Sequence, residues 1–225
     1  MTEEQRDAAL RALAHDLQGI DVPVYVEAGI DPLTPVLGAG DPNAAIGVFG
    51  RDPGRHEVLH QTPFVGQGGQ KIRAALHRVR FGTEPPDFDA ALAVGQDVFW
   101  ANTVPYKPIG NKAWSTAVKR RFAPLVRDLL LRGWAGRDML CLGREAFLWF
   151  GLGDRETTRL LDAHWKREDR YESSCEVELR DEHGSATFRL HPLPHPSPLN
   201  ATWAPHFGRL ADARLRALGW GASPL

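Results

Sequence analysis

Short apolar segments that alternate with amphipathic helical segments constrain the fold of this chain more than any other feature. Strand-like runs lie at 44–50, 97–101 and 138–142, followed by 172–180 and 185–190, which a turn joins. Helical spacing of apolar residues occurs at 3–18, 70–80, 115–132, 144–151 and 205–218. This order predicts an α/β protein whose mostly parallel sheet has helices on both faces. Residues 20–43, which hold four prolines, are predicted to be irregular. The composition marks no linker, so we expect one domain over residues 1–225.

The composition excludes several classes of protein. Of the 225 residues, 43% are hydrophobic and 24% are charged, which is typical of a globular chain and not of a disordered or fibrous one. Cys141 and Cys175 are too few for a disulfide scaffold or a four-cysteine metal site, so a reducing cytosol is the expected location. No run of 18 apolar residues occurs, and residues 1–20 are acidic and helical rather than signal-like. We therefore expect a protein that neither spans a membrane nor is exported.

The charges are unevenly distributed, although the net charge is only −1. Residues 1–31 carry seven acidic side chains and two basic ones, whereas residues 102–127 carry six basic side chains and no acidic one. Residues 50–80 carry six bases against Asp52 and Glu57, and residues 184–209 carry two bases and no acid. If these three basic segments converge, they form a positive surface that can bind a phosphate backbone. Separate solvated helix faces explain the same pattern equally well.

The loops that follow the predicted strands are where a ligand is expected, because open parallel sheets bind ligands beyond the carboxyl ends of their strands. Residues 50–69 place Asp52 in a proline-fixed turn and lack the Lys-Ser/Thr ending of a nucleotide P-loop. Residues 102–114 begin with Asn102. Residues 191–204 hold His191 and His195 among prolines that prevent a metal-binding helix. Taken singly, such an Asp is more often a turn residue, such an Asn a cap, and such a His a hydrogen-bonded loop residue.

Together the three loops resemble the motifs of the uracil-DNA glycosylase superfamily. GRDPG and PFVGQGG, within residues 50–69, are similar to GEAPG and PFVG-x-AG of its iron–sulfur-containing, family 4 branch. NTVPYKPIGNK at 102–112 is similar to NVVKCRPPGNR of that branch, and HPSPLN at 195–200 to HPSPLS of the common uracil enzyme. DMLCLGREAF at 138–147 resembles the intervening strand-to-helix segment. The resemblance runs from about Ala44 to about Leu218. It implies a three-layer α/β/α sandwich with a central, mostly parallel four-stranded sheet.

Two departures separate this chain from the iron–sulfur branch. Tyr106 stands where that branch has the cysteine of NVVKCRPP, and no N-terminal cysteine pair is present, so we expect no cluster, no other cofactor and no metal. Arg51 stands where the branch carries its water-activating carboxylate. Asp52, one residue later, matches the aspartate of the GQDPYH motif in the common enzyme. The chain therefore resembles a hybrid of two branches.

The resemblance implies catalytic and base-binding roles. Asp52 would stabilise the sugar cation and position water, and His195 would donate to uracil O2 as the base becomes anionic. Phe64 would stack on the flipped base, and Asn102 would select uracil through its N3–H and O4. Glu57 and Gly54 would complete the base-binding residues at the C5 edge of the base, where Glu57 would exclude thymine.

The resemblance also implies contacts with DNA. One leucine would enter the base stack as the nucleotide leaves it, and several polar or basic groups would hold phosphates. The expected DNA-binding residues are Leu199, Ser197, Lys107, Lys112, Arg51 and Gly66. The implied partners are uracil-containing DNA and free uracil as the product. We expect a monomeric, cytoplasmic and nucleoid-associated protein.

Three functions remain open on the sequence alone. The first is a glycosylase that flips uracil out of DNA and hydrolyses its N-glycosidic bond, leaving an abasic site. The second is a catalytically weak member that binds DNA or damaged ends, for which Arg51 leaves room. The third is a hydrolase of free nucleosides, which needs neither Leu199 nor a basic surface. Strand preference, mismatch context and activity on hypoxanthine, xanthine or thymine also stay open, because one or two contacts decide them.

Overall fold

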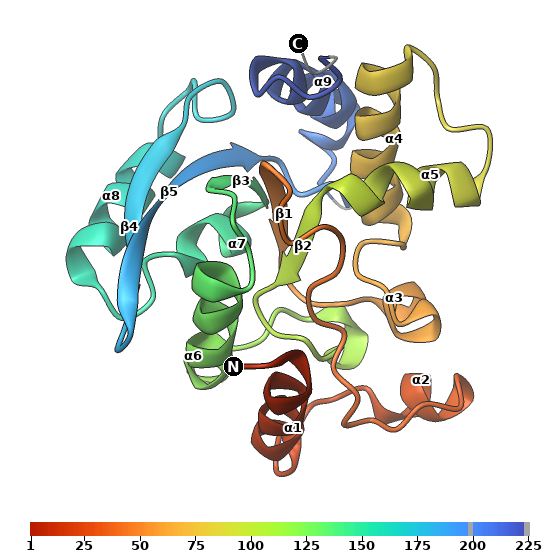
Figure 1. Ribbon diagram of the computed structural model, residues 1–225, viewed down its shortest axis with the longest axis vertical. Helices are drawn as coiled ribbons and strands as arrows, with labels where there is room; N and C mark the ends of the chain where they lie inside the picture. The colour runs from red at the N-terminus through yellow and green to blue at the C-terminus, as the bar shows by residue number, and fades with distance from the viewer. Residues whose placement is uncertain (198–199, 223–225) are drawn as a thin grey trace.

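The computed structural model describes residues 1–197 and 200–222, and within them five strands form one sheet in the order β2-β1-β3-β5-β4 (Figure 1). The strands are β1 (Ile46–Gly50), β2 (Phe99–Asn102), β3 (Asp138–Leu142), β4 (Cys175–Asp181) and β5 (Gly184–Leu193). β2, β1, β3 and β5 pair in parallel, and β4 pairs antiparallel with β5 at the edge. The α/β class and the mostly parallel sheet are confirmed. The predicted count of four strands is wrong, because the hairpin of β4 and β5 adds an edge strand.

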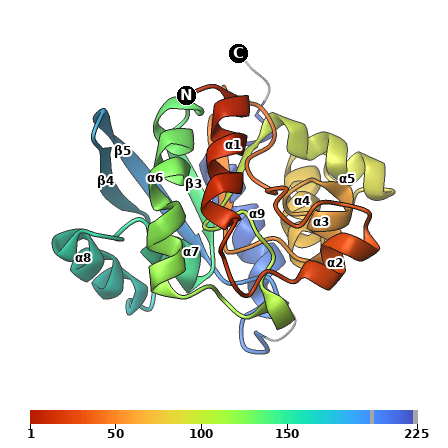
Figure 2. The ribbon, with the colours of Figure 1, turned by 90° about the horizontal axis from the view of Figure 1, so that it is seen from below.

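Helices cover both faces of this sheet, as the ribbon seen from below shows (Figure 2). One layer contains α6 (Thr116–Arg132), α7 (Arg144–Trp149) and α8 (Arg155–Trp165), whose buried residues join one hydrophobic cluster with the sheet. The opposite layer contains α4 (Gln67–Phe81), α5 (Phe88–Val94) and α9 (Phe207–Ala217), which share a second cluster with the sheet. The three-layer arrangement follows from this division of the core.

The alternation of side chains along β1 shows why the sheet needs two covering layers. Ile46 and Val48 point into the cluster beneath α4 and α9, and Phe49 points into the cluster beneath α6 and α7. Gly47, on the same face as Phe49, has no room for a side chain, because a Cβ atom there would lie 2.8 Å from the ring of Trp134. Because every residue of β1 is buried, the strand reads as a continuous apolar run.

The N-terminal segment packs beside the sheet as a third hydrophobic cluster. It contains α1 (Glu3–Ala14) and α2 (Val22–Glu27), and it meets the Val58 side of α3 (Arg55–His60). The prediction of irregular chain throughout 20–43 is therefore wrong at α2. Pro23 stands in the first turn of that helix, where a missing N–H costs nothing. Tyr25, which is fully buried, anchors the helix in the cluster.

In the described part of the chain, no helix combines the length and the apolar character that crossing a membrane requires.

Candidate active site

The loops that follow β1, β2 and β5 meet at one end of the sheet around a cleft of about 600 Å³. This convergence was expected from the sequence, since parallel strands present their carboxyl ends at the same edge. The lining residues are 50–57, 66–69 and 195–197 together with Phe64, Pro108, Asn111, Leu142 and Asn200. Asp52 and His195 thus share one cavity, although 143 positions separate them in the sequence.

Asp52 lies immediately beyond β1, and its side chain is only 1% exposed. The Thr103 hydroxyl is 3.5 Å from Asp52 Oδ1, and Arg51 Nε is 3.7 Å from Asp52 Oδ2. Oδ2 is buried without a hydrogen-bond partner among the described residues. Burial raises the pKa of this carboxyl from its ordinary 3.8 to about 7, against the opposing effects of Arg51, Lys119 and Thr103. The carboxyl is therefore poised to change charge near neutral pH.

His195 projects from the loop that follows β5 and carries a neutral imidazole. Burial lowers its pKa to about 4, and the nearby positive charge of Arg51 adds to this effect. The backbone N–H of Ser197 donates to His195 Nδ1 at 3.2 Å, which leaves the ring proton on Nε2. The Asn200 amide donates to the carbonyl of His195 at 3.2 Å and so fixes the loop. At neutral pH the ring is therefore neutral, with its hydrogen-bond donor at Nε2.

Phe64 is held in a left-handed backbone conformation, with φ of 57°, and its ring packs 5.1 Å from that of Trp100. A Cβ atom at Gly50 would lie 2.6 Å from the Phe64 ring, so only glycine leaves room for it. Strain of this kind persists only where the surroundings enforce it. The ring therefore has a fixed place in the cleft.

Arg73 holds the backbone on either side of this conformation, and in the sequence it stands out only as one of the basic residues of segment 50–80. It is 2% exposed, and its Nε and Nη2 donate to the carbonyls of Phe64 and Pro63 at 2.8 and 3.1 Å. Its guanidinium also lies 4.4 Å from the centre of the Trp100 ring. The signal in the sequence was its position one residue after Ile72 and three before Leu76, on the apolar face of α4.

Asn102 ends β2 and is 2% exposed. Its Nδ2 lies 3.4 Å from the carbonyl of Val36, to which it donates. It is not one of the residues that line the cleft, but a Cβ atom at Gly50, which does line it, would lie 3.7 Å from Asn102 Oδ1. The amide is therefore oriented by the protein and lies just behind the wall of the cleft.

A sequence model of the uracil DNA glycosylase superfamily matches residues 37–219, which include every loop of this cleft. The chain belongs to the uracil-DNA glycosylase superfamily. No individual curated protein is similar enough to be matched to it. Membership supports a glycosylase fold with a role in DNA repair and DNA as the binding partner. The particular branch suggested by the motifs remains a prediction.

Glu57 was predicted to exclude thymine from the pocket of this superfamily member. Its carboxylate accepts the backbone N–H of Gly54 at 3.0 Å and that of Gly66 at 2.7 Å. Glu57 therefore ties the first half of the loop after β1 to its second half, and it is itself buried. All three residues line the cleft. Contact with the C5 edge of a base stays a prediction.

The residues predicted to contact DNA occupy different environments. Arg51 Nη2 donates to the carbonyl of Asn111 at 3.0 Å, so this guanidinium lies over the cleft beside Asp52. Ser197 and Gly66 line the cleft, and Lys112 is exposed in the loop after β2. The prediction for Leu199 lies outside the described residues.

A phosphate contact by Lys107 is incompatible with its burial. The residue is 4% exposed, and its ammonium pairs with Asp21 at 2.7 Å. Lys119 pairs with Glu145, and Arg121 pairs with Asp16. Internal pairing therefore neutralises three of the six basic side chains of segment 102–127, and Lys112 and Arg120 are the exposed cations of its sequence that these pairs leave.

Proposed function

We propose that this protein excises uracil from DNA by hydrolysing the bond between the base and deoxyribose. The observation that carries the proposal is that Asp52 and His195 line one cleft, with pKa values displaced in opposite directions. When two neighbouring groups have pKa values displaced in this way, one can stabilise positive charge and the other negative charge. Membership of the superfamily supports the same function.

The base reaches the cleft only after it leaves the DNA stack, because its glycosidic bond is inaccessible inside a duplex. Phe64 offers a flat surface whose backbone is locked by Arg73. Asn102 retains its Oδ1 and one N–H for a base, because Val36 takes only one donor. Uracil presents a donor at N3 and an acceptor at O4, which match these two groups, whereas cytosine presents the reverse.

The hydrolysis needs Asp52 as a carboxylate. Breaking the C1′–N1 bond leaves positive charge on the sugar and sends the electron pair to the base. Ionised Asp52 stabilises that cation, and its Oδ2, which is buried without a hydrogen-bond partner among the described residues, is left to accept a hydrogen bond from the water that attacks C1′ when DNA is bound. Arg51 Nε, also buried without a partner among the described residues, lies 3.7 Å away and favours the ionised form. The water adds a hydroxyl group to C1′. Its other proton neutralises the uracil anion that leaves.

His195 stabilises the negative charge that develops on the departing base. With its proton on Nε2 it donates to O2 of the departing uracil, and its low pKa means that the ring is neutral at neutral pH. A neutral donor strengthens its hydrogen bond as negative charge develops, and this stabilises the transition state selectively.

The test is incubation of the purified protein with labelled single- and double-stranded oligonucleotides that contain one uracil, followed by alkaline cleavage. We expect strand breaks at uracil, and a loss of about 100-fold or more in Asp52→Asn and in His195→Ala. Asp154→Asn, a change at an exposed helix cap, is the matched control and should keep full activity. Intact uracil strands with a folded native protein would refute the proposal.

One observation favours a second candidate, a member that binds DNA with little catalysis. A pKa of about 7 leaves much of Asp52 protonated at neutral pH in the free protein. A binding module of this kind would retain DNA in a salt-dependent manner and release no base. In that case Asp52→Asn would change neither binding nor product, which the same assay separates from the first candidate.

A further inference from the structure

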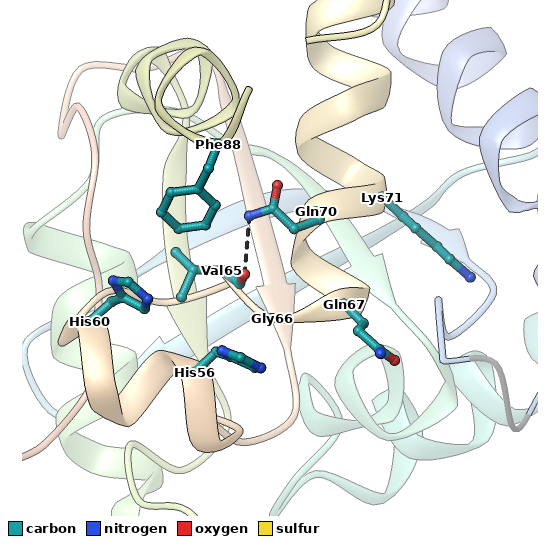
Figure 3. A pocket seen from close by; sticks show the side chains of 8 residues that line it. All are labelled: His56, His60, Val65, Gly66, Gln67, Gln70, Lys71 and Phe88. Atoms are coloured by element: carbon teal, nitrogen blue, oxygen red, sulfur yellow. Dashed lines mark hydrogen bonds between the residues drawn. The ribbon is translucent and has the colours of Figure 1, made fainter. Parts of the chain in front are cut away.

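A second cavity, of about 820 Å³, lies between α3, α4 and the start of α5 (Figure 3). It adjoins the catalytic cleft, because His56, Gly66 and Gln67 line both. Figure 3 shows Phe88 reaching from α5 toward His60 and Val65 across the cavity. None of the catalytic roles proposed above uses this space.

The walls of this cavity have the chemistry that recognises a nucleobase. Phe88 is 38% exposed, and its ring lies 5.3 Å from that of His60, so two flat rings are open to solvent side by side. The side-chain amide of Gln70 lies beside them: its Nε2 donates to the Val65 carbonyl at 3.0 Å, and its oxygen remains an acceptor. Bases stack on such rings whatever their sequence, and amides bond to their edges.

The charges around the cavity suit a nucleic acid strand. The eight described residues that line it include no carboxylate. Lys71 lies on the first turns of α4, and its ammonium donates to the carbonyl of Pro196 at 2.9 Å, in the loop that carries His195. That ammonium therefore joins the second cavity to a residue that lines the catalytic cleft. An ammonium carries three donors, so one contact with Pro196 leaves others for a phosphate.

We propose that this cavity binds the base of a nucleotide that neighbours the target on the same DNA strand. The shared walls favour this occupant over a free metabolite, because His56, Gly66 and Gln67 line both cavities, so a strand with its target base in the cleft can place a neighbouring base in the second cavity. The inference rests on the proposed function insofar as DNA occupies the catalytic cleft. It adds a contact with an unpaired base, and thus a preference for single-stranded or locally opened DNA.

The test measures binding separately from catalysis. Single-stranded oligonucleotides with one uracil are prepared with a baseless tetrahydrofuran residue at each of the three positions on either side of it. Their affinity for Asp52→Asn protein is measured by fluorescence anisotropy. We expect one flanking position at which removal of the base weakens binding about tenfold, as for loss of one base stacked on an aromatic ring. Adding Phe88→Ala to this protein should weaken binding of the complete oligonucleotide by the same factor and abolish the positional effect.

Two further variants keep the result interpretable. His60→Ala, which removes the other ring, should reduce the positional effect in a protein that keeps Phe88. Phe81→Ala removes an exposed phenylalanine at the far end of α4 and should leave it unchanged. Equal affinity for all the baseless oligonucleotides, in a protein whose native form excises uracil, overturns the second site alone. A positional effect that depends on Phe88, in a protein that excises no uracil, supports the second site and refutes the proposed function.

Discussion

Replacing Asp52 by asparagine is expected to make the protein more stable than the native chain at alkaline pH. The native fold holds this carboxyl at 1% exposure with a pKa of about 7, whereas in the unfolded chain it titrates near its ordinary 3.8. Between these two values the native state binds a proton that the unfolded state has lost. The free energy of unfolding therefore falls as the pH rises, which is the reverse of the usual behaviour of a paired carboxylate.

The magnitude follows from the two pKa values. A difference of one pKa unit is worth about 1.4 kcal/mol, so raising the pKa of Asp52 from 3.8 to about 7 is worth about 4 kcal/mol once both states are ionised. The loss begins near pH 4 and is nearly complete above pH 7. Asparagine occupies almost the same volume and does not ionise, so Asp52→Asn should escape it.

Urea denaturation of both proteins between pH 4 and pH 9 measures this difference directly. The free energy of unfolding of Asp52→Asn minus that of the native chain should grow by about 4 kcal/mol across the range. Asp154→Asn is the control, because hydrogen bonds from Thr157 lower the pKa of Asp154, so that this carboxylate is ionised in both states over most of the range and the difference for this variant should change little with pH. A difference for Asp52→Asn that stays constant with pH would refute the reasoning.

Two further predictions concern catalysis, and a third concerns stability. In the native protein, kcat/KM for uracil excision should rise about tenfold per pH unit below pH 7 and level off above it. The reason is that Asp52 of the DNA-free protein must ionise, while His195, with a pKa of about 4, stays neutral over this range. A flat profile would contradict this. Gly50→Ala should lower kcat about 100-fold with the fold retained by circular dichroism, because its Cβ would displace the Phe64 ring; unchanged kcat would count against a fixed stacking surface. Arg73→Met should lower the free energy of unfolding by about 1–3 kcal/mol, measured in urea, because it leaves buried carbonyls without donors; an unaffected midpoint would show that Arg73 does not hold this loop.

Local patterns in the sequence were sufficient for the strands that carry the site. The apolar runs at 44–50, 97–101 and 138–142 correspond to β1, β2 and β3, because buried parallel strands need apolar residues on both faces. The convergence of the loops beyond them followed from parallel pairing alone. The order of the motifs within those loops was enough to place Asp52 and His195 in one cleft.

Features that depend on tertiary contacts could not be predicted in this way. Helix α2 lies in a proline-rich stretch, and its stability comes from burial of Tyr25, whose hydroxyl accepts the backbone N–H of Lys107. The Lys107 ammonium was expected to face DNA, but its partner, Asp21, lies 86 residues earlier in the chain. The raised pKa of Asp52 likewise depends on how deeply its loop is buried, which no local pattern records.

The most direct test of the central claim is quantification of the free base released from single-stranded DNA that contains uracil. In a single-turnover experiment at pH 8, the native protein should release one uracil per uracil site and leave an abasic strand, and Asp52→Asn should release it about 100-fold more slowly or worse. Release of no base by a native protein that binds this DNA, or release at equal rates by both proteins, would contradict the assignment of Asp52 and of the reaction.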